Sequence, residues 1–279
     1  MRLGIQVSIV GKIYESLDRA RRLGCNTMQI FSRNPRTWRL TGLDKEEIEE
    51  FKIRRKRLGI GPVFIHIPYL ANLASPYKRL YKKSILAYIE DIKEAENLGA
   101  DYIITHLGSH KETSEKSGIK RFIRALNEII DEAKTKVGIL LENTAGSGSW
   151  LGYNFKHHQR IIDGLKDASS VGICLDTCHA YVAGYNIATQ DGLDRLLYQI
   201  DSLIGLERLR LIHLNDAKDK LSSRSDRHEH IGKGRIGRAG FRRIINHPKL
   251  KDLAFILETP KKTEQDDIMN LHTVRALIN

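Results

Sequence analysis

Histidines and carboxylates stand at the ends of short apolar runs throughout this chain of 279 residues, and that placement suits a metal site. Imidazole and carboxylate together form the ligand set of Zn²⁺ or Mn²⁺ in hydrolytic or isomerising sites. Nine ligands are too many for one ion, so the sequence predicts two or three metal ions. The nine candidate ligands are His66, His106, Glu142, Asp176, His179, His213, Asp226, His228 and Glu258.

Each candidate also has an ordinary structural interpretation. A single histidine at a strand end is commonly a hydrogen-bonded structural residue, Glu142 or Glu258 could cap a helix, and Asp226 could be a solvated turn residue. Charged groups at the water-poor end of a fold cost several kcal/mol unless a metal or a counter-charge compensates them, so their coincidence favours metal. The residues that we do not expect to be ligands are His110, His157, His158, His230, His247, His272, Cys174 and Cys178.

Eight runs rich in Ile, Val and Leu alternate with helical patterns, which is typical of a parallel sheet buried on both faces. This number of units in a chain of this length predicts one α/β domain over residues 1–279, a (β/α)8 TIM barrel. A doubly wound open sheet is the alternative. In such a barrel the active site forms at the carboxyl ends of the strands, where the candidate ligands stand. The runs cover residues 3–9, 27–31, 63–68, 102–108, 138–144, 171–177, 209–216 and 253–260.

The composition bounds the partners and the location. The chain has 46 Lys and Arg against 34 Asp and Glu, and the resulting charge of +12 suits a polyanionic partner, although a solvated basic surface would look the same. No apolar run approaches the roughly 18 residues of a membrane span. The first residues lack the apolar core of a signal peptide, so we expect a cytoplasmic protein with no membrane partner. Three cysteines argue against a disulfide framework and favour buried thiols.

Eight sequence blocks, in order along nearly the whole chain, resemble those of the endonuclease IV family of apurinic/apyrimidinic (AP) endonucleases. These type 2 AP endonucleases belong to the xylose isomerase-like TIM barrel superfamily. The blocks "LDTCHA" (175–180) and "DRHEHIG" (226–232) are the most specific. The others are "FSRNPRTW", "HIPYLANLASP", "THLGSH", "LENTAGSGSWLG", "HLNDAK" and "LETP".

The resemblance implies a trinuclear zinc centre. One zinc ion would be held by His66, His106 and Glu142, and a second would share Glu142 and add Asp176, His213 and Glu258. The third would be held by His179, Asp226 and His228. We expect three Zn²⁺ per chain, with Mn²⁺ as an alternative at one site.

The same resemblance implies an enzyme of base excision repair. It would hydrolyse the phosphodiester 5′ to an abasic site in duplex DNA with a metal-activated hydroxide that the catalytic Glu142 holds. The products would be a 3′-hydroxyl and a 5′-deoxyribose phosphate, and the enzyme would also act as a 3′-repair diesterase. We expect a monomer.

Three further residues would contact DNA by this resemblance: Arg36, Tyr69 and Leu70, inserted as wedges that hold the gap open. Two positions depart from the family pattern. Gln6 replaces a histidine that is common in the first strand, and Leu107 replaces the proline of a "HPGSH" block. The competing hypotheses are a metal-dependent sugar isomerase or epimerase with a related barrel, and a DNA-binding protein that keeps metal for structure only.

Overall fold

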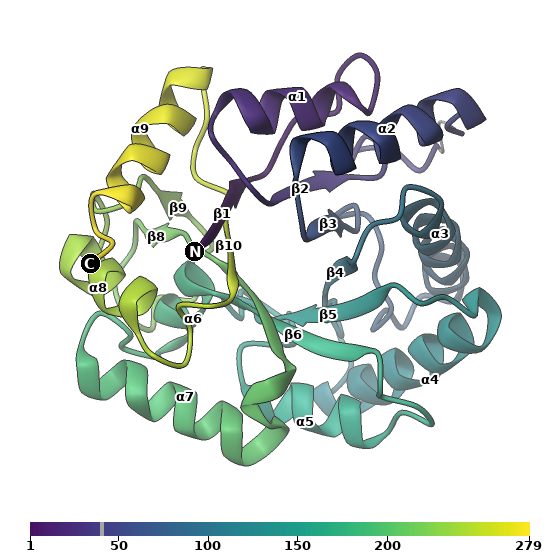
Figure 1. Cartoon of the computed structure of the whole chain (residues 1–279). Coiled ribbons are helices and arrows are strands. Elements are labelled where there is room, and N and C mark those ends of the chain that lie inside the picture. The colour runs from purple at the N-terminus through teal and green to yellow at the C-terminus, as the bar shows by residue number, and fades with distance from the viewer. Residues whose placement is uncertain (40–41) are drawn as a thin grey trace.

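The computed structural model describes residues 1–39 and 42–279. In this part of the chain, eight parallel strands form one nearly closed barrel, and Figure 1 shows them at the centre with the helices around them. The ring closes between β1 and β2 through a bridge of Gln6 with Gln29 and a 2.8 Å hydrogen bond from the Val7 N–H to the Gln29 carbonyl. In sheet order the strands are β1 (Arg2–Ile5), β10 (Ala254–Leu257), β7 (Leu209–His213), β6 (Val171–Asp176), β5 (Gly138–Glu142), β4 (Tyr102–His106), β3 (Val63–His66) and β2 (Met28–Phe31).

Helices follow the strands and cover the outside of the barrel (Figure 1), and several of them are amphipathic. In α4, for example, Phe122, Leu126 and Ile129 form part of the buried face, while Ser114 caps the first turn by accepting from the Ser117 N–H. The helices are α1 (Glu15–Arg22), α2 (Lys45–Leu58), α3 (Lys78–Asn97), α4 (Glu115–Ala133), α5 (Phe155–Asp163), α6 (Thr177–Ala183), α7 (Gln190–Ile204), α8 (Gly237–Asn246), α9 (Glu264–Arg275) and the 3₁₀ turn η1 (Leu206–Arg208). A short antiparallel pair, β8 (Asp216–Ala217) with β9 (His228–Glu229), lies beyond β7.

The barrel interior explains where the candidate ligands point. A compact cluster of buried side chains fills it, contributed by Phe64, Ile104, Leu140, Cys174, Leu211, Ala254 and Ile256. Side chains alternate along a strand, so the residue two positions later points to the same side. Counting two forward from six of these core residues gives His66, His106, Glu142, Asp176, His213 and Glu258. The fold therefore directs six candidate ligands toward the barrel axis, at the carboxyl end.

The sequence prediction of eight β/α units in a TIM barrel is confirmed, and the open-sheet alternative is wrong. The strands are shorter than the apolar runs. The first apolar run covers residues 3–9, but strand β1 ends at Ile5, which lies opposite Leu257, the last residue of β10. Within residues 1–39 and 42–279, no helix has the length and apolar composition needed to cross a membrane.

Candidate metal centre

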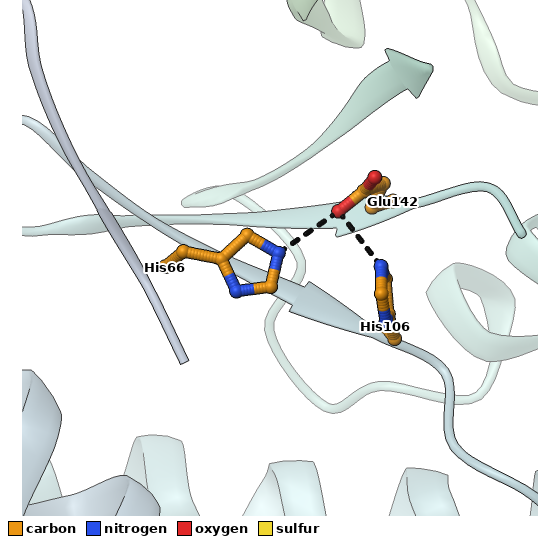
Figure 2. Close-up of side chains that lie close together, drawn as sticks. All are labelled: His66, His106 and Glu142. Carbon is orange, nitrogen blue, oxygen red and sulfur yellow. Dashed lines mark hydrogen bonds and ion pairs between the residues drawn. The ribbon is translucent and has the colours of Figure 1, made fainter. Parts of the chain in front are cut away.

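Three of the nine candidate ligands meet at the ends of the neighbouring strands β3, β4 and β5. The Nε2 atoms of His66 and His106 each lie 3.1 Å from the Oε2 atom of Glu142. Figure 2 shows both imidazoles turned toward this carboxylate oxygen. His66 and Glu142 are buried and His106 is half-buried. The three donor atoms are close enough together to hold one metal ion.

A second group uses the other oxygen of the same carboxylate. The Nδ1 atom of His213 lies 3.1 Å from Glu142 Oε1 and 3.3 Å from Glu258 Oε2. Asp176, fully buried at the end of β6, completes the group with its Oδ2 atom 4.0 Å from the same nitrogen. Glu142 thus presents one oxygen to each of two ligand groups, which is the arrangement of a bridging carboxylate.

The third group forms where β6 turns into α6. Asp176 caps α6 by accepting from the His179 N–H at 2.7 Å, and this tight turn brings His179 toward the barrel mouth. The Nε2 atom of His179 lies 3.1 Å from Asp226 Oδ1, and that of His228 lies 3.6 Å from the same oxygen. Asp226 and His228 come from the loop after β8 and from β9. All nine predicted residues therefore lie in three adjoining groups.

Hydrogen bonds to backbone carbonyls orient three of the imidazoles. The Nδ1 atoms of His66, His179 and His228 lie 2.7, 2.9 and 3.0 Å from the carbonyl oxygens of Ile67, Asn143 and Glu258. A carbonyl only accepts, so Nδ1 carries a proton, and in the neutral imidazole the lone pair on Nε2 is free to bind a metal ion. Among the described residues, the buried Nε2 of His228 has no hydrogen-bond partner, which a bound cation would supply.

The charges of the centre are interdependent. Burial opposes ionisation of Glu142, but His106 and His213 overcome it and hold its pKa well below the ordinary value. Burial likewise opposes a charge on His179, yet Asp176 and Asp226 raise the pKa of that imidazole. The Glu142 carboxylate is thus held in the ionised form that binds metal. The donors are imidazole nitrogens and carboxylate oxygens, and six of the nine side chains point toward the barrel axis. This donor set fits divalent zinc.

The sequence did not identify several residues that hold the ligands in place. Asn215 donates from Nδ2 to Asp176 Oδ2 at 2.6 Å, and the Oδ1 of Asn143 accepts from the Asp176 N–H at 2.7 Å. Both asparagines lie in the quoted sequence blocks, within two residues of a candidate ligand, and this short spacing could have identified them. Gln29 contacts the two candidate ligands Glu258 and His213. The feature of the sequence that could have identified it is that it is the one polar residue in an otherwise apolar strand, β2. Asp216 lies in the same quoted block as Asn215, and its carboxylate accepts hydrogen bonds from the backbone at the far end of the loop that carries Asp226.

The residues expected to contact DNA lie around the centre or on the surface. Tyr69 is 59% exposed and its ring centroid lies 5.9 Å from that of His66, so it stands at the rim of the first group. Leu70, beside it, is half-buried. Arg36 is exposed on the loop after β2, and a buried ion pair of Arg33 with Asp91, 2.7 Å long, anchors the start of that loop.

The remaining histidines and cysteines lie outside the three groups. His157 and His158, which were not expected to be ligands, both lie on helix α5 and are buried. Burial lowers the pKa of His158 to about 3, which keeps it neutral. Cys174 and Cys178 are buried, as expected of small core residues, although Cys178 also lies near Asp176 and His228.

Comparisons with known proteins agree with this architecture. The family model described as "Xylose isomerase-like TIM barrel" matches residues 17–273. A relative named "Probable endonuclease 4", from Halothermothrix orenii, is 45% identical over 271 residues, which cover 97% of this chain and 98% of the relative. The crystal structure of endonuclease IV from Thermus thermophilus matches with a TM-score of 0.89 and 36% identity, over 99% of this chain and 98% of that one.

A D-tagatose 3-epimerase-like protein also matches, with a TM-score of 0.75 over 99% of this chain and 97% of that one. Its identity is only 19%, so this likeness concerns the fold alone. The identity to proteins named endonuclease 4 is much higher, reaching 45% over 97% of this chain. The chain therefore belongs to the endonuclease IV family, within the xylose isomerase-like TIM barrels.

Proposed function

We propose that this protein is a DNA repair endonuclease that cuts duplex DNA 5′ to abasic sites at a trinuclear zinc centre. The observation that carries the proposal is the convergence of nine imidazole and carboxylate side chains in three adjoining groups, two of which share Glu142. Family membership supports the nuclease activity, since the relatives are named as endonucleases. We further propose that the chain acts as a single barrel domain and a monomer.

The donor set suits three zinc ions that meet a polyanionic substrate. One group would be His66, His106 and Glu142, the second would add Asp176, His213 and Glu258 to Glu142, and the third would be His179, Asp226 and His228. Bound zinc would supply Lewis acidity and a hydroxide nucleophile at neutral pH. Four carboxylates among nine ligands do not neutralise three divalent ions, so the centre would retain positive charge for a phosphodiester.

The residues of the chain would position the substrate. Glu142 is buried between two ligand groups, where its carboxylate would hold both metals and orient the attacking water. Tyr69, exposed beside His66, would fill the gap left by the missing base, together with Leu70 and Arg36. An abasic nucleotide has lost stacking and pairing, so turning it out of the duplex costs less than for a normal nucleotide. The charge of +12 would add affinity that falls as salt rises.

The test is a cutting assay on labelled duplexes with purified, zinc-loaded protein. We expect a nick on the 5′ side of one abasic-site analogue, with a 3′-hydroxyl product, and far slower cutting of the undamaged duplex. A duplex with a blocked 3′ end tests the proposed 3′-repair diesterase activity. Turnover of ketosugars without nicking would instead favour an epimerase, and tight DNA binding with neither reaction would favour a binding protein. A metal count on the same protein tests the expected three zinc ions.

A further inference from the structure

The side chain of Gln29 lies inside the barrel, under the second ligand group. It belongs to β2, whose other residues are apolar, and it is fully buried. Its amide touches two of the nine candidate ligands: Nε2 donates to Glu258 Oε1 at 2.5 Å, and Oε1 lies 2.7 Å from His213 Nε2. Nε2 also donates to Gln6 Oε1 at 2.8 Å. A buried amide with each of its polar atoms engaged is held in one orientation.

The partners of this amide determine which nitrogen of His213 carries the proton. A carboxylate and an amide oxygen both accept, so the NH₂ group of Gln29 must face Glu258 and Gln6. The carbonyl oxygen of Gln29 then faces His213 Nε2, which must donate. An imidazole that binds a metal ion is neutral and has one N–H, so in the metal-bound form Nδ1 of His213 would present its lone pair to the ion. That nitrogen lies 3.1 Å from Glu142 Oε1 and 3.3 Å from Glu258 Oε2, inside the second group.

His213 differs in this respect from three other candidate ligands. His66, His179 and His228 are oriented by backbone carbonyls, which the fold provides whatever the side chains nearby. His213 is oriented by a side chain, and its Nδ1, rather than its Nε2, faces its ligand group. A substitution at Gln29 therefore removes an orienting contact that the backbone of this site does not replace.

We propose that Gln29 is a positioning residue for the second metal ion, which fixes the tautomer of His213 and the rotamer of Glu258 together. The inference rests on the proposed function, because it concerns the zinc ion that Glu142, Asp176, His213 and Glu258 would share. Gln6, one of the two departures from the family pattern, accepts a hydrogen bond from the same amide and is therefore one contact further from this ion than Gln29. Its test measures zinc affinity apart from cutting.

The experiment compares zinc retention in the wild type and in Gln29→Met, which keeps the side-chain length but loses both hydrogen-bonding functions. Zinc-loaded proteins are titrated with a chromophoric chelator at fixed pH, and the ions released per chain are counted. We expect one of three ions to bind about 10–100-fold more weakly in the variant, the usual cost of losing an outer hydrogen-bond partner. Retention of the other two ions would show that the barrel is folded.

Two further variants sharpen the result. Gln6→Met removes one hydrogen bond from the same amide without removing a ligand contact, so its affinity should stay within about threefold of the wild type, less than the usual cost of losing a direct partner of a ligand. Gln29→Asn keeps an amide but withdraws it by one methylene, and it should lose the same ion as Gln29→Met, which covers the case that the methionine variant misfolds.

The outcomes separate the two proposals. Wild-type protein that holds three ions while Gln29→Met and Gln29→Asn hold them equally tightly would overturn the role of Gln29 and leave the proposed function intact. Equal weakening in Gln6→Met and Gln29→Met would also overturn it, since general loosening of the barrel would then explain both. A wild type that takes up no zinc would overturn the proposed function and this inference together.

Discussion

The carboxylate of Asp216 holds the backbone of the loop that supplies Asp226 and His228 to the third ligand group. It is fully buried, and its Oδ2 accepts from the N–H groups of Gly232 and Gly234, both at 2.9 Å. Its Oδ1 accepts from Ala217, Ile236 and Gly237 at 2.8, 2.9 and 3.4 Å. Gly234 approaches so closely that an added Cβ would lie 2.4 Å from the Ala217 carbonyl oxygen. One carboxylate thus holds the far end of the loop that carries Asp226 and His228.

Asp216→Asn tests this role with almost no change in volume. One acceptor oxygen becomes an NH₂ group that faces backbone N–H donors, so at least two hydrogen bonds are lost. Hydrogen bonds to a charged acceptor contribute about 1.5–3 kcal/mol each, and an amide is cheaper to bury than a carboxylate. Burial does raise the pKa of Asp216, so part of the loss is recovered. The expected decrease in the free energy of unfolding is about 3 kcal/mol, or roughly 6–12 °C in Tm.

The assay is urea unfolding of zinc-free protein, because bound metal would couple binding to folding. Limited proteolysis, followed by mass spectrometry, then shows whether cleavage moves into residues 218–227. The matched control is Asp219→Asn in the same loop. Asp219 pairs with Arg227 at 2.9 Å near the surface, where solvent screens the charges and such pairs contribute little to stability. If the two variants unfold within about 0.5 kcal/mol of each other and resist protease equally, the reasoning on Asp216 is wrong.

Two other substitutions give predictions of a different kind. Glu142→Gln keeps the shape of the side chain but removes the charge that two ligand groups share, so turnover should fall by several orders of magnitude while DNA binding largely persists. Nicking rates measure the turnover and gel shifts measure the binding. A near-normal nicking rate would refute the mechanism. Burial, and to a lesser extent the charge of Asp91, raises the pKa of Glu94 to about 7. The folded state therefore binds the Glu94 proton more tightly than the unfolded state, and the protein loses stability as pH rises from about 4.5 through 7. Zinc-free Glu94→Gln should therefore match the wild type near pH ~4 and exceed it by about 1–3 kcal/mol at pH ~8, whereas equal unfolding free energies at the higher pH would contradict the prediction.

The sequence predicted the barrel and the approximate place of the ligands because both follow from short-range patterns. Apolar runs of the right length mark strands, and the alternation of side chains carries His106 and Glu142 to the same interior as Ile104 and Leu140. Strand ends were predicted less well, since the hydrogen-bonded pairing of a strand also depends on where the neighbouring strand ends, which the strand's own residues do not show. The partners of Gln29 were not predictable in this way: His213 is 184 residues away, and the two meet only when the ring of strands closes.

The three ligand groups are not held with equal rigidity, and the difference follows from the elements that supply them. The first group comes wholly from strand ends, and the second adds Glu258 just beyond β10 with the amide of Gln29 behind it. The third draws on a helix turn and a loop, and its Asp226 side chain is 51% exposed. Loops open at lower free energy than core strands, so the metal ion proposed for the third group should be the first that a chelator removes. Asp216→Asn should hasten loss of that ion, and Gln29→Met should weaken a different one. If Asp216→Asn and Gln29→Met weaken different ions, the contribution of the loop to metal binding can be measured separately from that of the barrel strands.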